Sequence, residues 1–139
     1  MSVIVTDTGF GTDDWTADII AVADLAANDA SPAIAIDLNS DSDPSLLRER
    51  LADIDMIRID FPSFADGRGF TIAKRLRQMG YSGRLRARGH VISDQYAMAR
   101  RVGFDEVEIN DDLAARQPES EWLFRANWKA SDYQNRLRA

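Results

Sequence analysis

The stretch DMIRIDFPSFADGRGFTIAKRLRQMGYSGRLRAR, residues 55–88, predicts a strand, a helix and a second strand in succession. Apolar side chains dominate the first strand, 55–61. The helix is indicated by a broad apolar face made of Phe70, Ile72, Ala73, Leu76 and Met79. Gly80 suits the left-handed residue that ends a helix, and RLRAR, 84–88, follows as the next strand. A unit of this kind builds parallel sheets.

The same alternation continues on both sides of this unit. Further strands are predicted over 3–6, 33–37 and 106–109. Helical spacing and capping residues predict further helices over 15–27, from Pro44 through Leu51 with Asp43 as its cap, from Ser93 to Val102, and over 119–129. The sequence therefore predicts one α/β domain, 1–139, with a frayed polar tail over 131–139.

The expected architecture is a mainly parallel sheet of about four to five strands flanked by helices. A three-layer, Rossmann- or flavodoxin-like arrangement is the first choice. The alternative is a half β/α-barrel-like arrangement, since eight strand–helix units do not fit in 139 residues.

Composition excludes several classes of site and of protein. The chain has no cysteine, which rules out disulfides, thiolate nucleophiles and thiolate metal sites. Its single histidine, His90, rules out a multi-histidine metal site. No apolar run approaches the roughly 20 residues of a membrane span, and the first residues lack the basic and apolar regions of a secretory signal. We expect a cytoplasmic protein that does not bind membranes.

Positive charge is concentrated in one part of a chain whose net charge is −6. Residues 67–104 hold nine basic residues against the single acidic Asp94. On the predicted helix, Lys74, Arg75 and Arg77 are expected to share the solvent side and to form a docking face for an acidic partner. The alternative is a pair of solvated helix faces. Nucleic acid is not an expected partner, because the chain is acidic overall and carries no binding motif for it.

Polar residues follow the predicted strands, where ligands of parallel α/β sheets bind. These residues are expected to share one rim: Asp37, Asn39, Asp60, Asp66, Arg68, Arg88, His90, Glu108 and Asn110. The loop before the 70–79 helix adds glycines that permit close backbone approach, and free N–H groups at the helix start favour anions. A small-anion site is predicted from Asp66, Gly67, Arg68, Gly69, Thr71 and Arg88. The alternative is that the Asp66-Gly67 pair only turns the chain and that Gly69 lets the helix pack on the strand.

No catalytic motif stands out. His90 and Asp60 are the candidate catalytic residues, because both lie at strand ends. A carboxylate metal site from Asp37, Asp60 and Asp66 is conceivable, but such aspartates more often cap or turn the chain, so no metal site and no tightly bound cofactor are expected. The aromatic residues Trp122, Phe124 and Trp128 fit helix packing better than a cofactor platform.

The segment IDFPSFADGRGFTIAKRLRQMGYSGRLRARGHVISDQYAMARRVGFDEVEI, residues 59–109, resembles a bacterial family known as domain of unknown function 934. The resemblance rests on the long pattern of FxDGRG, LR, GY-x-G, LRA, DQ and GFD. It implies a small soluble protein linked to assimilatory sulfate and sulfite reduction, and members are often labelled oxidoreductases. Val102 and His90 stand where the family often has Cys and Asp, so a family-wide thiol role does not carry over to this chain.

Two functions follow from the resemblance. The first is an accessory or binding protein of sulfite reduction, which docks on sulfite reductase or another acidic redox protein and binds a small anion. The second is a small oxidoreductase that borrows an external cofactor or a partner's redox centre, because the chain carries no redox group of its own.

Overall fold

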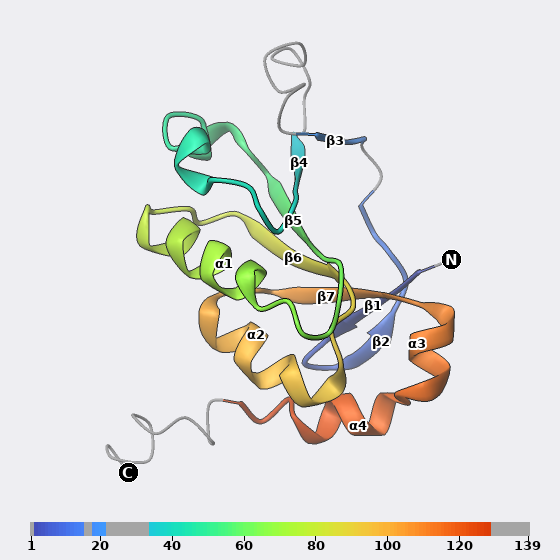
Figure 1. Cartoon of the computed structure of the whole chain (residues 1–139). Coiled ribbons are helices and arrows are strands. Elements are labelled where there is room, and N and C mark those ends of the chain that lie inside the picture. The colour runs from blue at the N-terminus through green and yellow to red at the C-terminus, as the bar shows by residue number, and fades with distance from the viewer. Residues whose placement is uncertain (1, 16–17, 22–33, 129–139) are drawn as a thin grey trace.

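A computed structural model describes residues 2–15, 18–21 and 34–128 as one seven-stranded sheet with helices packed on it (Figure 1). The strands are β1 (Ser2–Thr6), β2 (Gly9–Gly11), β3 (Ile19–Ala21), β4 (Ala35–Leu38), β5 (Met56–Phe61), β6 (Arg84–Gly89) and β7 (Glu106–Asn110). The α-helices are α1 (Arg68–Gln78), α2 (Tyr96–Val102), α3 (Asp111–Arg116) and α4 (Glu119–Phe124), and three short 3-10 helices are η2 (Pro44–Leu47), η3 (Leu51–Asp53) and η4 (Ser93–Gln95).

The sheet is mainly parallel, as predicted, but it has more strands than predicted. Its order is β2-β1-β7-β6-β5-β4-β3. Strands β3 to β7 pair in parallel, whereas β1 pairs antiparallel with both β2 and β7. The additional strands are the short edge strands β2 and β3, which the turn-rich and helix-like sequence patterns concealed.

Strands β3 to β7 lie side by side in chain order. This is the order of a half β/α-barrel, in which each unit adds its strand beside the previous one. A doubly wound sheet instead reverses direction at a switch point, and that point provides its ligand crevice. Strands β3 to β7 make no such reversal, and β1 joins the sheet antiparallel beside β7.

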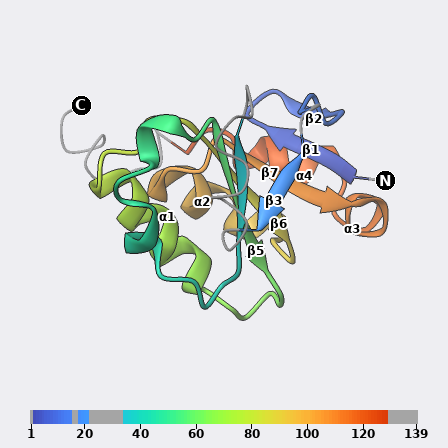
Figure 2. The ribbon, with the colours of Figure 1, turned by 90° about the horizontal axis from the view of Figure 1, so that it is seen from above.

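One face of the sheet carries the apolar core. Helices α1 and α2 lie together on this face (Figures 1 and 2), and Leu113 of α3 and Trp122 of α4 join the same core. The apolar strand residues of the central sheet are buried in this core: Ile57, Ile59, Leu85, Val107 and Ile109. Since all four α-helices contribute to this one core, the described residues do not form the expected third layer.

Local expectations were met in part. Gly80 takes a φ of 100° after α1, as predicted, and the next residue, Tyr81, donates its N–H to the Leu76 carbonyl at 3.0 Å. Asp43 caps the turn at Pro44, but this turn is a 3-10 helix that ends at Leu47.

Three further predicted helices differ from the structure. The helix over 119–129 ends at Phe124, and the helix from Ser93 begins as the 3-10 turn η4. The helix over 15–27 is wrong at Ile19–Ala21, which form β3; residues 16–17 and 22–27 lie outside the described residues, as does the predicted tail. Here β-branched Ile19 and Ile20 pair in parallel with Ala35 and Ile36. Ser93 does not cap α2 with its side chain; its hydroxyl donates to Gln117 at 2.8 Å.

Candidate functional site

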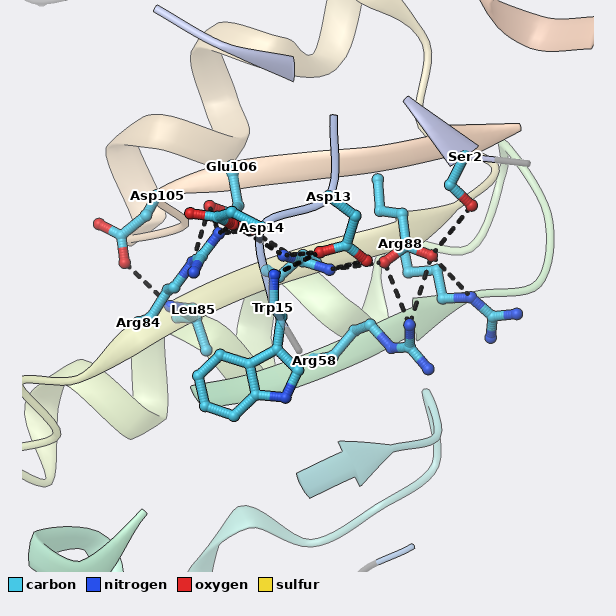
Figure 3. Close-up of polar contacts among 12 residues, drawn as sticks. Ser2, Asp13, Asp14, Trp15, Arg58, Arg84, Leu85, Arg88, Asp105 and Glu106 are labelled. Carbon is cyan, nitrogen blue, oxygen red and sulfur yellow. Dashed lines mark hydrogen bonds and ion pairs between the residues drawn. The ribbon is translucent and has the colours of Figure 1, made fainter. Parts of the chain in front are cut away.

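Charged side chains cover the sheet face opposite the helices. Successive side chains of a strand point to opposite faces, so the arginines at alternate positions of β6 share this face, and the glutamates at alternate positions of β7 lie beside them. Figure 3 shows the resulting network. We call its strand residues the charged ladder: Asp37, Arg58, Arg84, Arg86, Arg88, Glu106 and Glu108.

Arg86 lies at the centre of the charged ladder, and its side chain is 0% exposed. It donates to Glu106 and, at 2.9 Å, to Glu108. Asp13 accepts from both of its terminal nitrogens at 3.1 and 3.0 Å. Burial alone would lower the pKa of Arg86, but the bonds and charges of these carboxylates raise it above its usual value. The Arg86 cation is therefore permanent and inaccessible to an external partner.

The neighbouring arginines are satisfied in the same way. Arg58 donates to Asp37 at 2.6 and 2.8 Å and to Glu108 at 3.1 Å. Arg84 donates to both oxygens of Glu106 at 2.9 Å and to Asp14. Much of the positive segment 67–104 is thus neutralised by carboxylates of the same chain. Asp13 and Asp14 were not predicted as partners, although the alternation of Arg on β6 matches that of Glu on β7 and indicates paired charges.

Arg77 does not belong to a docking face. Its guanidinium donates, at distances between 2.7 and 3.0 Å, to the backbone carbonyl oxygens of Tyr81, Gly83 and Gly103. The expectation that Arg77 points to solvent is wrong, because these carbonyls at the ends of α1 and α2 draw it inward. Lys74 and Arg75 are exposed, so only these two members of the expected docking face are on the surface.

The expected rim separates into two hollows. The first, which we call the strand-end pocket, has a volume of about 280 Å³ and lies at the carboxyl ends of β5, β6 and β7. Five residues of the expected rim line it: Asp60, Arg88, His90, Glu108 and Asn110. It also contains both candidate catalytic residues. The sequence thus predicted most of its polar lining, and Ser2 of β1 is the polar residue it missed.

The second hollow, which we call the loop groove, has a volume of about 400 Å³ and lies between the start of α1 and the turn after β4. Arg68 and Thr71 of the predicted anion site line it. The polar residues that the sequence analysis did not assign to this groove are Ser40, Asp41, Ser42 and Arg75. Arg75 follows Arg68 by seven positions and therefore lies on the same helix face, a spacing that could have identified it.

The structure separates residues that were expected in one anion site. Arg88 lines the strand-end pocket and not the loop groove, because it continues the alternation of Arg84 and Arg86 on the ladder face. In the loop groove, Arg68 Nη2 donates to Ser40 at 2.9 Å, while Asp37 accepts from Arg58.

The contacts of the Asp66–Gly69 loop fit the turn interpretation for two of its residues. Asp66 accepts from the Arg68 backbone N–H at 3.1 Å and from the Arg68 guanidinium at 3.0 and 2.7 Å. The bonds from Arg68 hold the pKa of Asp66 well below its usual range. A Cβ at Gly69 would come within 2.5 Å of the Phe61 ring. Asp66 therefore caps the turn, and Gly69 lets α1 pack on β5.

The candidate catalytic residues have few fixed partners. His90 Nδ1 lies 3.2 Å from the carbonyl oxygen of Phe61, and its ring meets Phe64 edge-on at 5.1 Å. Asp60 lies 3.8 Å from Arg88. Within residues 2–15, 18–21 and 34–128, no group of three or more His, Cys, Asp and Glu side chains could hold a metal ion. No helix in the same part of the chain is long and apolar enough to cross a bilayer.

The aromatic residues near the C-terminus differ from one another. Trp122 is buried and meets Tyr96 edge-on at 6.0 Å, which fits the predicted packing role. Trp128 lies under Arg100 and donates to Asp7 at 3.2 Å. Phe124 is exposed, so the packing interpretation is wrong for this residue.

These features define a small mixed α/β protein whose mainly parallel sheet has one apolar face under helices and one charged face. The chain belongs to the family described as "bacterial protein of unknown function (DUF934)", which it matches over residues 35–139. No curated protein and no solved structure matches it.

Proposed function

We propose that this protein is a cytoplasmic accessory protein of bacterial sulfite assimilation that binds a small anion in the loop groove. The pathway is carried over from the resemblance of residues 59–109 to its family. The anion is supported by one observation, which is that the groove collects two arginines and several hydroxyl groups beside one another. Guanidinium and hydroxyl donors suit the oxygens of sulfite, sulfate or phosphate.

The spacing of the donors on α1 supports a single site. Arg68, Thr71 and Arg75 are separated by three and four positions, so their side chains lie along one helix face. Arg68 is partly used, since Asp66 and Ser40 accept from its Nε and Nη2. The Arg75 guanidinium lies 3.6 Å from Asp43, which is beyond hydrogen-bonding distance, and its side chain is 47% exposed. Arg75 therefore contributes most of the donor capacity.

Lys74 and Arg75 also form the exposed remainder of the expected docking face. We propose that they contact an acidic redox protein, with sulfite reductase as the first candidate. The alternative function is a small oxidoreductase in sulfite reduction, which would borrow an external cofactor or a partner's redox centre.

Anion binding is tested by titrating the isotope-labelled protein with sulfite, sulfate and phosphate while recording amide and arginine Nε resonances. We expect shifts at Arg68, Thr71 and Arg75. Thr71→Val and Arg75→Gln should each weaken binding, whereas Lys74→Gln, on the neighbouring exposed position, should not. Equal affinity in Thr71→Val, Arg75→Gln and the unmodified protein would exclude the loop groove.

Docking is tested separately with sulfite reductase components at low salt, where surface charges act most strongly. Lys74→Glu should weaken association, while Thr71→Val should leave it unchanged. Arg101→Glu on the exposed side of α2 is the charge-matched control. Association that is equally strong with Lys74→Glu would rule out this face.

A further inference from the structure

The strand-end pocket offers a second binding site, independent of the loop groove. It lies where the charged ladder meets the carboxyl ends of β5, β6 and β7. The ligands of β/α folds bind at this end of the strands. The proposed anion uses none of its residues, so its charged groups have no role in the function proposed above.

The charges at this end of the charged ladder are held loosely compared with those inside it. Arg58 and Arg86 have carboxylate partners within 3.1 Å. Arg88 lies 3.5 Å from Glu108 and 3.8 Å from Asp60, which exceeds the usual length of a hydrogen bond. The side chains of Arg88 and Asp60 are 48% and 39% exposed. Figure 3 shows Arg88 at the end of the network. Arg88 and Asp60 thus keep hydrogen-bonding capacity for a ligand.

Glu108 is already engaged by side chains inside the charged ladder. It accepts from Arg58 at 3.1 and 3.3 Å and from Arg86 at 2.9 Å, two cations that it shares with Asp37, Asp13 and Glu106. The charged groups of the pocket that keep hydrogen-bonding capacity are therefore one cation, Arg88, and one anion, Asp60. A simple anion would be repelled by Asp60 and a simple cation by Arg88, whereas a ligand that carries both charges satisfies both.

Two neutral groups extend this complementarity. Asn110 uses its side-chain oxygen to accept from the Leu113 N–H at 2.8 Å, which leaves its amide NH₂ as a donor. When His90 Nδ1 donates to the Phe61 carbonyl, at 3.2 Å, the other ring nitrogen of His90 is an acceptor. Besides Arg88 and Asp60, the lining of the pocket thus offers one neutral donor and one neutral acceptor.

We propose that the strand-end pocket binds a small zwitterion of the α-amino acid class. Arg88 and the Asn110 amide hold its carboxylate, and Asp60 with the His90 ring holds its ammonium group. The volume of about 280 Å³ suits such a ligand, because it lies just below the roughly 300–1,000 Å³ of sites that bind drug-sized molecules.

The test is an NMR titration of the intact chain with each standard amino acid, up to about 10 mM, a range that reports weak metabolite affinities. At least one should shift the amides of Gly89 and His90 in a saturable way. For L-alanine, the matched half-ligands are propionate and ethylamine. Each should bind at least about ten-fold more weakly than the amino acid, a loss that corresponds to one missing charge contact.

Variants separate this site from the rest of the surface. Asp60→Asn and Arg88→Gln should abolish the shifts, while Asp112→Asn on α3 and Arg101→Gln on α2, both exposed and outside the pocket, should preserve them. The proposal is overturned by absence of binding for every amino acid, by equal binding of propionate, by unchanged binding in both pocket variants, or by shifts confined to the loop groove. The half-ligand comparison uses the unmodified protein, so it remains decisive if a variant fails to fold.

Discussion

The guanidinium of Arg86 and the carboxylate of Asp13, 73 positions apart in the chain, form a two-bond ion pair with distances of 3.1 and 3.0 Å. Arg86 belongs to the open face of the sheet, yet it is completely buried because the segment around Asp13 covers it (Figure 3). Parallel bonds between guanidinium and carboxylate fix geometry as well as charge. The pair therefore ties the N-terminal segment to the middle of the sheet.

Arg86→Leu should destabilise the protein by about 3–5 kcal/mol, because it removes the one cation that Glu106, Glu108 and Asp13 share and leaves fewer positive than negative charges in the buried network. Urea denaturation followed by circular dichroism measures this free energy of unfolding. Arg88→Leu is the matched control at the exposed end of the charged ladder and should cost less than about 1 kcal/mol. Similar losses in the two variants would mean that Arg86 is not the centre of the network.

Asp13→Asn should lower the free energy of unfolding at neutral pH and should also make this free energy less sensitive to acid. Burial opposes the charge of Asp13, but the hydrogen bonds from Arg86 lower its pKa below the usual value of 3.8. A carboxyl group whose pKa is lower in the folded than in the unfolded protein stabilises the fold at pH values above its unfolded-state pKa. This stabilisation is lost as the pH falls through its folded-state pKa. We expect a loss of about 1–2 kcal/mol at pH 7, limited by partial exposure, and a shallower decline below about pH 4.

Urea titrations at several pH values between neutral and strongly acidic conditions check this expectation. Asp112→Asn, on an exposed position of α3, is the control. Parallel curves for Asp13→Asn and the unmodified protein would show that the Arg86 bonds do not carry the acid sensitivity.

Arg77→Gln should cost about 1.5–3 kcal/mol, since a charged donor to several backbone carbonyls is lost. Lys74→Gln, three positions earlier on the same helix but exposed, should change stability by less than about 0.5 kcal/mol. Thermal melts of the two variants distinguish the structural role of Arg77 from a docking role. If Arg77→Gln left the stability unchanged, the bonds of Arg77 to the backbone carbonyls would not stabilise the fold, and a docking role would be favoured.

Gly69→Ala should destabilise the protein by about 1–3 kcal/mol, because its Cβ would overlap the Phe61 ring and force α1 away from β5. Gly67→Ala is the control, since the nearest atom to its Cβ would be 4.0 Å away, in Phe70. Differential scanning calorimetry of both variants gives the comparison. If Gly69→Ala melts at the same temperature as the unmodified protein, close packing against Phe61 is not the reason that position 69 is a glycine.

Local periodicity predicted most of the central fold. The five-residue apolar face of the 70–79 helix and the apolar strand 55–61 each bury a clear stripe, so their type was readable without tertiary information. Ile19 and Ile20 were not readable, because apolar residues at helical spacing surround them. Their strand exists through pairing with Ala35 and Ile36, which a local pattern does not contain.

The sequence predicted most residues of the candidate site, but it did not predict which of them share one hollow. Asp60, Arg88 and His90 follow from strand ends, and the structure brings them into one pocket. Arg88 was predicted to join the loop groove, but it lines the strand-end pocket because its side chain lies on the ladder face of β6. The pairing of Arg86 with carboxylates was not predicted, because its partners Asp13 and Glu106 come from distant segments.

The alternation of charges on β6 and β7 also determines how these strands align. A shift by one residue would move Arg86 into the helical core and Leu85 onto the charged face. A shift by two would keep the faces but would remove either Arg84 or Arg88 from its glutamate partner on β7. Parallel strands are joined through distant segments and find their alignment slowly. The charged face thus acts as a register key, which admits one alignment of the central strands and penalises its nearest competitors.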